Sequence, residues 1–148
     1  DELTPKDYYY LLLGQYAQTS RLIDSSANCG LVVADTNSLV TKAYYDYYLK
    51  ESPVQDGETD TFDNLFASIL SKEKWDLILF AEPVGTYVND GFRDMSMADE
   101  AIRSDFSSHL KRLKDQCLAH IPTVYLAGSY LDNYQAAKEA IDMIYQAD

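Results

Sequence analysis

Short apolar runs alternate along the chain with longer stretches in which apolar residues recur every three or four positions. Such short runs are typical of strands buried on both faces of a parallel sheet. They cover residues 31–34, 77–81 and 123–127. The periodic stretches are typical of amphipathic helices. They cover roughly residues 5–24, 38–50, 61–71, 96–117 and 134–145. This order predicts an α/β fold of three layers, in which helices flank a parallel sheet.

Two of the predicted helices begin with capping residues. Thr4 suits the N-cap, Pro5 suits the first helical position, and Asp7 completes a capping box. Ser96 and Asp99 have the spacing of a second capping box. The residues predicted to face inward are Tyr9, Leu12, Leu13, Tyr16 and Ile23 in the first helix; Phe62, Leu65, Phe66 and Ile69 in the third; Ile102, Phe106, Leu110, Leu113 and Cys117 in the fourth; and Ala137, Ala140, Ile141 and Ile144 in the last.

Length and charge limit the classes of function. The 148 residues have the size of one domain, so we expect residues 1–148 to form a single domain. The 24 acidic and 12 basic side chains give a net charge of −12, which argues against binding to nucleic acid or to an anionic membrane surface. A nucleotide ligand is compatible with this charge because it needs only a few local cations and backbone N–H groups.

The cysteines and the start of the chain indicate the cellular compartment in which the protein is expected. Cys29 and Cys117 form no C-x-x-C motif, and we expect two buried thiols in a reducing cytosol. No apolar run approaches the ~20 residues of a membrane span, and no signal peptide is visible. We therefore expect a cytoplasmic protein. Because the chain opens on Asp1 and Glu2 without a methionine, we also expect a fragment or a processed product.

Polar residues follow each predicted strand, at the end where ligands bind in parallel α/β sheets. The segments are Asp35-Thr36-Asn37, Glu82-Pro83 and Gly128-Ser129. Asp35 is a candidate to hold Mg²⁺ through water or to accept a proton from a substrate hydroxyl. The alternative is that Asp35 or Thr36 caps the following helix.

Two arginines lie beyond the second predicted strand. Arg93 follows an Asn-Asp-Gly turn, and Arg103 lies in the helix that comes next. Two guanidinium groups there would match the oxygens of a phosphoryl group in transfer. The alternative is a set of surface ion pairs with neighbouring carboxylates, which contribute little. Those carboxylates are Asp90, Asp94, Asp99 and Asp105.

The thirteen tyrosines are numerous for this length. Those over residues 8–10 and 44–48 occupy several helix faces, which leaves two interpretations. They form a stacking surface for a flat heterocycle, or they pack in the core with the hydroxyl at the surface. His109 and His120 are isolated and indicate no metal site.

Taken together, these motifs resemble the kinase domain of the NadR family. V-V-A-D-T-N is followed by Thr41, and W-D-L-x-L covers the second strand. Y-V-N-D-G-F-R, over residues 87–93, is followed ten residues later by Arg103. The family pattern is roughly D-T-D…T-T at the first site and W-V-D-D-G-x-R at the second. The tract Leu13-Gly14-Gln15 also matches, so the resemblance spans essentially the whole chain.

The resemblance implies a P-loop kinase fold like that of the nucleoside monophosphate kinases. The implied activity is ATP-dependent phosphorylation of nicotinamide riboside to nicotinamide mononucleotide in NAD salvage. The catalytic residues would then be Asp35, Arg93 and Arg103, and Asp35 would also bind the metal, near Mg²⁺ and the acceptor 5′-hydroxyl. Arg93 and Arg103 would belong to a lid that closes over the ATP phosphates.

The resemblance also implies substrate-binding residues, which are Thr36, Asn37, Thr41, Tyr87, Asn89 and Asp90. Tyr87 stands where the family often has tryptophan, so contact with a flat ring is expected there. Asn37 and Asn89 replace family aspartates, which argues against a metal role at those two positions. An adenylyltransferase domain usually precedes the kinase domain in this family, so the resemblance implies such an upstream domain as a partner.

One family motif is absent from the sequence. The P-loop pattern G-x-x-x-x-G-K-[S/T] does not occur among the six glycines. The chain therefore resembles the carboxyl-terminal part of such a kinase domain, without the P-loop strand that would lie between the first two strands. We expect one of three arrangements: a further segment of the protein supplies this strand, another copy fills the gap in a homo-oligomer, or the strands close up directly. Alone, the chain is expected to bind ATP poorly.

Two alternatives to the nicotinamide riboside kinase stay open. One is a P-loop kinase for another nucleoside, which acceptor selectivity would distinguish. The other is a non-catalytic module that senses NAD metabolites, which a lack of ATP turnover in the intact protein would favour.

Overall fold

The computed structural model describes residues 3–26, 30–49, 58–83, 87, 91 and 95–146, with the backbone alone at 58–60. It divides into two compact units, Asp1–Glu73 and Lys74–Asp148, and each is described by itself. The predicted single domain over residues 1–148 stays a prediction. In the described part of the chain, no helix is both long and apolar enough to cross a membrane.

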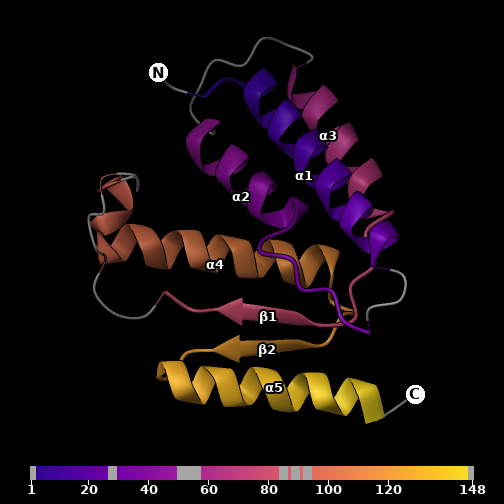
Figure 1. The fold of residues 1–148 in the computed structure, drawn as a ribbon. Helices are drawn as coiled ribbons and strands as arrows, with labels where there is room; N and C mark the ends of the chain where they lie inside the picture. The colour runs from indigo at the N-terminus through magenta and orange to yellow at the C-terminus, as the bar shows by residue number, and fades with distance from the viewer. Residues whose placement is uncertain are drawn as a thin grey trace. The chain divides into compact units, whose positions relative to one another are not determined.

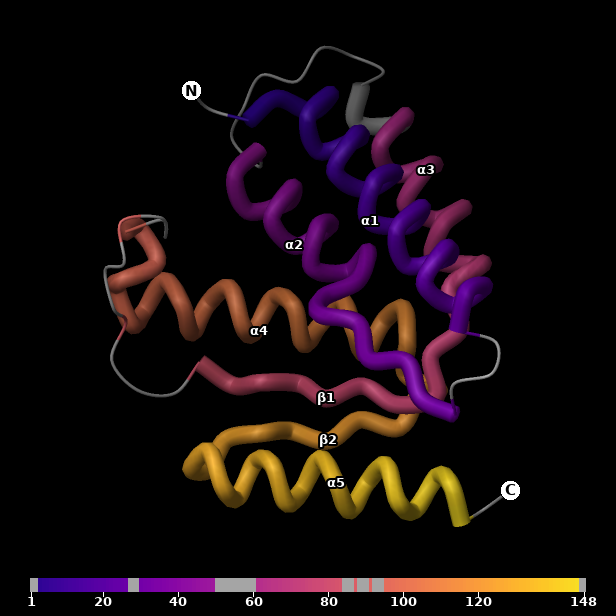
Figure 2. The backbone as a smooth tube through the Cα atoms, viewed as in Figure 1, coloured from indigo at the N-terminus to yellow at the C-terminus, as the bar shows by residue number. Residues whose placement is uncertain are grey.

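The first unit is built from three helices. They are α1 (Pro5–Ser25), α2 (Ser38–Leu49) and α3 (Glu58–Leu70). α1 packs against both α2 and α3 (Figures 1 and 2). The buried apolar residues are Tyr8, Leu12, Leu39, Ala43, Tyr45, Phe62, Phe66 and Ile69. All three helices match predicted ones, with boundaries that differ by three residues or fewer.

Stacked aromatic rings form the centre of this core. The rings of Tyr45 and Phe62 lie parallel with centroids 3.8 Å apart, and Tyr8 meets Tyr45 edge-on at 5.7 Å. Lys42 Nζ lies 5.4 Å from the Tyr45 ring centroid and pairs with Asp46 at 2.5 Å and Asp63 at 3.0 Å. Burial alone would lower the pKa of Lys42, but the two carboxylates outweigh it and the pKa is raised. The tyrosines at positions 8 and 45 therefore pack in the core.

The start of α1 confirms the predicted capping box, but the inward face differs from the prediction. Asp7 N donates to Thr4 Oγ1 at 3.3 Å, and Thr4 N donates to Asp7 Oδ2 at 2.8 Å. The hydrogen bonds from the Thr4 side chain and backbone lower the pKa of Asp7. Tyr8 is buried instead of Tyr9, and Ile23 is 45% exposed. α1 has 21 residues whereas α2 and α3 have 12 and 13, so neither is long enough to cover its whole length.

The second unit contains a pair of parallel strands with helices. β1 (Ile78–Ala81) pairs with β2 (Thr123–Leu126), with Ile78 opposite Thr123 and Ala81 opposite Leu126. Between them lie the 3₁₀ helix η1 (Met95–Ala98) and α4 (Glu100–Cys117), and α5 (Tyr130–Gln146) follows. Figure 1 shows the strand pair between α4 and α5. The second and third predicted strands thus pair directly with each other.

The first predicted strand is wrong. Residues 31–34 form no strand, and Leu31 and Val33 are 51% and 67% exposed. A strand buried on both faces needs neighbouring strands, but every described regular element of the first unit is a helix. The predicted three-layer sheet is therefore reduced, in the described residues, to a small parallel sheet of two strands.

Two helix starts in the second unit also differ from the prediction. Asp99, and not Ser96, is the N-cap of α4: its carboxylate accepts from Ala101 N at 2.8 Å and Ile102 N at 3.3 Å. α5 begins at Tyr130, four residues earlier than expected, and no residue of α5 is fully buried.

Of the two cysteines, Cys117 is half-buried rather than buried, and Cys29 lies outside the described residues.

Candidate functional site

The segment before α2 is held by Asn37. The Asn37 side-chain oxygen accepts from Leu39 N at 3.2 Å, and its carbonyl oxygen accepts from Val40 N at 3.0 Å. Asn37 therefore caps α2, which is the role that the alternative interpretation gave to Asp35 or Thr36. That alternative is wrong for both residues, and Asp35 is left exposed, with no capping role.

A single side chain, Gln15 of α1, joins three of the predicted substrate-binding residues. Its amide oxygen accepts from Thr36 Oγ1 at 2.8 Å and from Asn37 N at 3.2 Å. Its amide nitrogen donates to Thr41 Oγ1 at 2.8 Å and to Asn37 O at 3.2 Å. We assign this orientation because it gives the oxygen two donors and the nitrogen two acceptors. We call Gln15, Thr36, Asn37 and Thr41 the Gln15 network.

Thr36 has a strained backbone within this network. Its φ is +66°, the left-handed region that β-branched residues rarely adopt. Such a conformation costs about 1–3 kcal/mol and persists only where surrounding contacts impose it. Gln15 supplies such contacts, because it bonds the Thr36 side chain and both backbone groups of Asn37.

Asp35 directly precedes the strained residue. Its side chain is exposed, and the described residues contain no group of three His, Cys, Asp or Glu side chains that could hold a metal ion. Mg²⁺ is commonly bound through one or two carboxylates together with substrate phosphates and water. A single exposed carboxylate fits that mode of binding and does not fit a metal site made of protein ligands alone.

At the carboxyl end of β1, Glu82 forms a second polar cluster. Glu82 Oε1 lies 2.5 Å from Lys111 Nζ of α4, and Ser107 Oγ donates to Glu82 Oε2 at 3.5 Å. Lys111 Nζ also lies 5.7 Å and 5.4 Å from the ring centroids of Phe80 and Tyr125. The sequence identified Glu82 as a strand end, but it did not identify Ser107 or Lys111.

Arg103 and Tyr87, two predicted site residues, lie together. The Arg103 guanidinium is 5.5 Å from the centroid of the Tyr87 ring. Its Nη1 donates to the carbonyl oxygens of Met97 at 2.9 Å and Ala98 at 2.7 Å. It forms no ion pair with either of the described candidate carboxylates, at positions 99 and 105. Its position therefore depends on η1 carbonyls and an aromatic face.

Three predicted site residues lie outside the described residues. They are Asn89, Asp90 and Arg93. Their roles remain predictions from the resemblance.

The carboxyl end of β2 is a tight turn. Gly128 N donates to Asn133 Oδ1 at 2.9 Å, and Asn133 Nδ2 donates to Gly128 O at 3.2 Å. A Cβ atom at Gly128 would lie 3.0 Å from Asp132 Cβ, so only glycine fits without a shift. At the start of α5, Asp132 Oδ2 accepts from Ser129 Oγ at 2.6 Å and from Ser129 N at 3.2 Å, and these two bonds, the side-chain one first, lower the pKa of Asp132. Asp132 N in turn donates to Ser129 Oγ at 3.3 Å.

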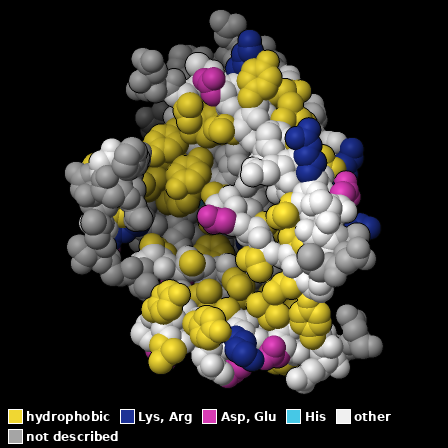
Figure 3. All heavy atoms as spheres, viewed as in Figure 1, with side chains coloured by type: hydrophobic (Ala, Val, Ile, Leu, Met, Phe, Trp, Pro, Cys, Tyr) yellow, Lys and Arg dark blue, Asp and Glu magenta, His cyan; other side chains and the backbone are white. Residues whose placement is uncertain are grey.

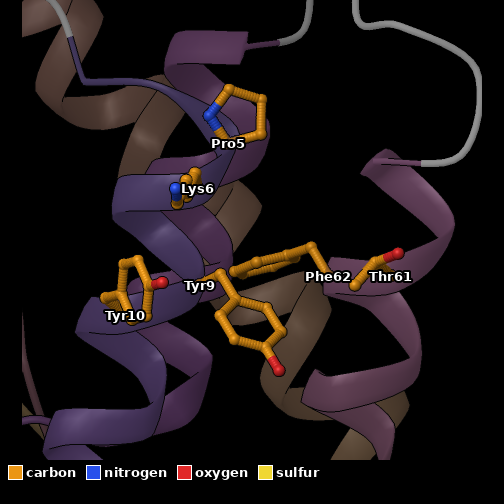
Figure 4. A pocket seen from close by; sticks show the side chains of 6 residues that line it. All are labelled: Pro5, Lys6, Tyr9, Tyr10, Thr61 and Phe62. Carbon is orange, nitrogen blue, oxygen red and sulfur yellow. The ribbon is translucent and has the colours of Figure 1, made fainter.

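An aromatic cavity of about 250 Å³ opens between α1 and α3. Figure 4 shows Phe62 reaching from α3 toward Tyr9 of α1, with Tyr10 and Lys6 on α1 beside them. Pro5 and Thr61 complete the lining. The tyrosines of the first helix thus divide, because Tyr8 packs in the core while its two successors line this cavity.

Sequence reasoning missed Gln15 as the centre of the first cluster, although a signal was present. Gln15 lies seven residues after Tyr8 and three after Leu12, so it falls on the buried face of α1. A polar residue on that face requires hydrogen-bond partners. The sequence also held a signal for the residues missed on α4. Ser107 and Lys111 follow Arg103 at intervals of four residues, so all three lie along one face of that helix.

Comparison with known proteins gives one family and two similar structures. The model of the AAA domain family matches residues 4–130. The crystal structure of NadR protein in complex with NR matches with a TM-score of 0.77 and 32% identity, over 95% of this chain and 38% of that chain. The crystal structure of NadR protein in complex with NAD and AMP-PNP matches with a TM-score of 0.72 and 28% identity, over 95% of this chain and 35% of that chain. No curated protein matches the chain.

These findings confirm the resemblance to NadR that the sequence predicted. The fold is P-loop-like α/β, mostly helical, with a small parallel sheet of two strands. The chain spans 35% and 38% of the length of the two NadR chains, little more than a third.

Proposed function

The chain belongs to the AAA domain family, and we propose that it is part of an ATP-dependent kinase that converts nicotinamide riboside to nicotinamide mononucleotide. The observation that carries this proposal is the match to NadR bound to NR, at 32% identity over 95% of the chain. The second match, to NadR bound to AMP-PNP, supports ATP as the phosphate donor.

In this proposal, Asp35 is the catalytic carboxylate. It is exposed beside the strained Thr36, so a substrate hydroxyl can approach it. There it orients the 5′-hydroxyl of the acceptor and accepts its proton as the oxygen attacks the γ-phosphorus, while the bond from this phosphorus to the β,γ-bridging oxygen breaks and ADP leaves. Asp35 would also hold Mg²⁺, which when bound offsets the charge of the ATP phosphates.

The neighbouring polar residues are assigned to the acceptor. The Thr36 side chain is exposed, and its hydroxyl is fixed by Gln15. Asn37 and Thr41 belong to the same network and lie at the start of α2. We assign these three residues to binding of the nucleoside, because hydroxyl and amide groups suit the hydroxyls of a ribose.

Arg103 and Tyr87 are assigned to the phosphate side. The guanidinium has two carbonyl partners and an aromatic face, which fix its position without neutralising its charge. A cation held in this way can stabilise charge that develops on a phosphoryl group in transfer. Asn89, Asp90 and Arg93 keep the substrate and lid roles that the resemblance implies.

The first test is ATP consumption by the full-length protein with nicotinamide riboside, beside a panel of ordinary nucleosides. Turnover selective for nicotinamide riboside is the expected result. Turnover with other nucleosides alone would support the kinase activity but exclude nicotinamide riboside as the acceptor. No turnover with any acceptor would favour a module that senses NAD metabolites.

Variants test the assigned residues separately. Asp35→Asn is expected to abolish phosphoryl transfer, while Asp24→Asn, at an exposed position of α1, leaves it unchanged. Arg103→Met is expected to lower kcat by about 100-fold, whereas Arg112→Met, at an exposed position of the same helix, has little effect. Near-normal rates for Asp35→Asn would remove this residue from the mechanism.

A further inference from the structure

Among the described side chains of α1, Gln15 makes the most extensive hydrogen bonds to the segment that carries Asp35. Its amide uses both lone pairs and both N–H groups on Thr36, Asn37 and Thr41. A side-chain amide has this bonding capacity only in one orientation, so the four contacts fix the position of the segment relative to α1. None of the four contacts involves a charged group.

These contacts surround the strained backbone of Thr36. On one side Gln15 accepts from the Thr36 hydroxyl, and on the other it bonds both the N–H and the carbonyl oxygen of Asn37. Without them, a β-branched residue at a φ of +66° would relax toward a negative φ. Such a rotation would reorient the peptide that joins Thr36 to Asp35.

We infer that Gln15 is a positioning residue that holds Thr36 in the left-handed conformation and thereby aims the carboxylate of Asp35. The catalytic part of this inference rests on the proposed function, in which Asp35 accepts the proton. Gln15 itself is partly buried and acts through the segment, not on the substrate. The inference therefore predicts an effect on the chemical step that exceeds the effect on binding.

The conformational part is tested on the chain itself, without any activity. Gln15→Leu keeps a side chain of similar size and removes all four hydrogen bonds, and Gln18→Leu at an exposed position of α1 is the matched control. By NMR, Gln15→Leu should shift the φ-dependent coupling of Thr36 and speed amide exchange at Asn37 by about tenfold, the effect of losing roughly one hydrogen bond. The control should leave both unchanged. An unchanged Thr36 coupling in Gln15→Leu would overturn the inference.

Rescue separates positioning from general loss of structure. Glycine adopts positive φ at no steric cost. Thr36→Gly in the Gln15→Leu background should therefore restore part of the unfolding free energy that Gln15→Leu loses. A residue that only stabilised the core would not be rescued at position 36. Absence of rescue, with an equal fall in stability for both proteins, would contradict the inference.

The catalytic part is tested by kinetics of the full-length protein. Gln15→Leu should lower kcat by about 100-fold, as expected for a misplaced catalytic group, with KM for nicotinamide riboside changed about threefold or less. A rise in KM with unchanged kcat would overturn the positioning role. An inactive wild type would refute the proposed function instead, and the NMR result would then decide the conformational inference by itself.

Discussion

The Gln15 network of the first unit and the clusters around Lys111 and Arg103 in the second unit are held by different means. In the first unit a neutral amide fixes the Asp35 segment through four hydrogen bonds beside a buried aromatic core. In the second unit Lys111 and Arg103 are held by a carboxylate, carbonyl oxygens and aromatic faces. Neutral hydrogen bonds are insensitive to salt, whereas partly exposed charges are screened by it. The first arrangement fixes a geometry. In the second, the charge of Lys111 is compensated by Glu82, while the Arg103 guanidinium bonds only uncharged carbonyl oxygens among the described residues.

The two units also differ in how deeply their apolar side chains are buried. Leu12, Ser38 and Phe62 in the first unit are less than 2% exposed. Among the described apolar residues of the second unit, those that are buried keep 3–9% of their surface exposed. They are Phe80, Met97, Leu113 and Leu118. In the second unit α5 has no buried residue, and Tyr130 and Leu131 are 89% and 72% exposed. Figure 3 shows hydrophobic side chains at the surface over α5, at the bottom of the view. We therefore expect the first unit to depend more strongly on its packed interior.

The largest expected effect comes from removing the central ring of the first unit. Phe62 is 1% exposed and stacks on Tyr45 at 3.8 Å, so Phe62→Ala should lower the free energy of unfolding by about 3–5 kcal/mol. Tyr134→Ala on α5, where the side chain is 57% exposed, should cost less than about 0.5 kcal/mol. Urea unfolding measures both variants. Equal losses would show that the difference between the cores has no energetic meaning.

The next effect concerns the ion pair of the second unit. Glu82 and Lys111 have side chains 19% and 37% exposed, so solvent screens their attraction. Glu82→Gln and Lys111→Met should each cost about 1 kcal/mol or less. A double-mutant cycle should give a coupling that shrinks at high salt, whereas the loss caused by Gln15→Leu should be independent of salt. A coupling unchanged by salt would refute the contrast between charged and neutral clusters.

Helix caps provide a smaller and matched comparison. Thr4→Ala and Ser129→Ala each remove a capping side chain, worth about 1 kcal/mol or less to the local helix. Thr4→Ala should lower the unfolding free energy, because α1 carries the buried Tyr8 and Leu12. Ser129→Ala should mainly fray the first turn of α5, seen as faster amide exchange there. A larger global loss for Ser129→Ala would reverse this expectation.

The smallest expected effect comes from the buried hydroxyl of Tyr8, which changes the unfolding free energy only at alkaline pH. Burial, followed by the nearby Tyr44, raises the pKa of Tyr8 above its ordinary value of 10.0. The folded state therefore holds the phenol proton more tightly than the unfolded state. The stability that this tighter proton binding contributes to the folded state is complete below about pH 10 and is lost as the pH rises through the folded pKa of Tyr8. The unfolding free energy of Tyr8→Phe, measured between neutral pH and about pH 11, should thus fall less than that of the wild type. Equal losses would contradict the burial of the hydroxyl.

Much of the helical structure was predictable from local sequence. Thr4, Pro5 and Asp7 specify the start of α1 by bonds within a single turn. The spacing of Phe62, Phe66 and Ile69 specifies the buried face of α3. The run over residues 31–34 misled because four apolar residues do not distinguish a buried strand from an exposed extended segment. That distinction depends on neighbouring strands, which local sequence does not supply.

The candidate site was predictable in part. The D-T-N motif and the resemblance identified Asp35, Thr36 and Thr41 as site candidates. The bonds that join Gln15 to Thr36 and Thr41 connect residues 21 and 26 positions apart. Contacts at this separation follow from how α1 packs on α2, so periodicity alone could not assign them. The positive φ of Thr36 was equally invisible, because threonine disfavours it.

The register of the parallel strands sets an order of folding. Ile78 pairs with Thr123, so each contact of the ladder joins residues 45 positions apart. Closing such a loop has a high entropic cost until the 18 residues of α4 have already become helical. We therefore expect α4 to be structured in the folding transition state and the strand pair to form after it. Mutations inside α4 would then slow refolding, while mutations in β2 would mainly speed unfolding.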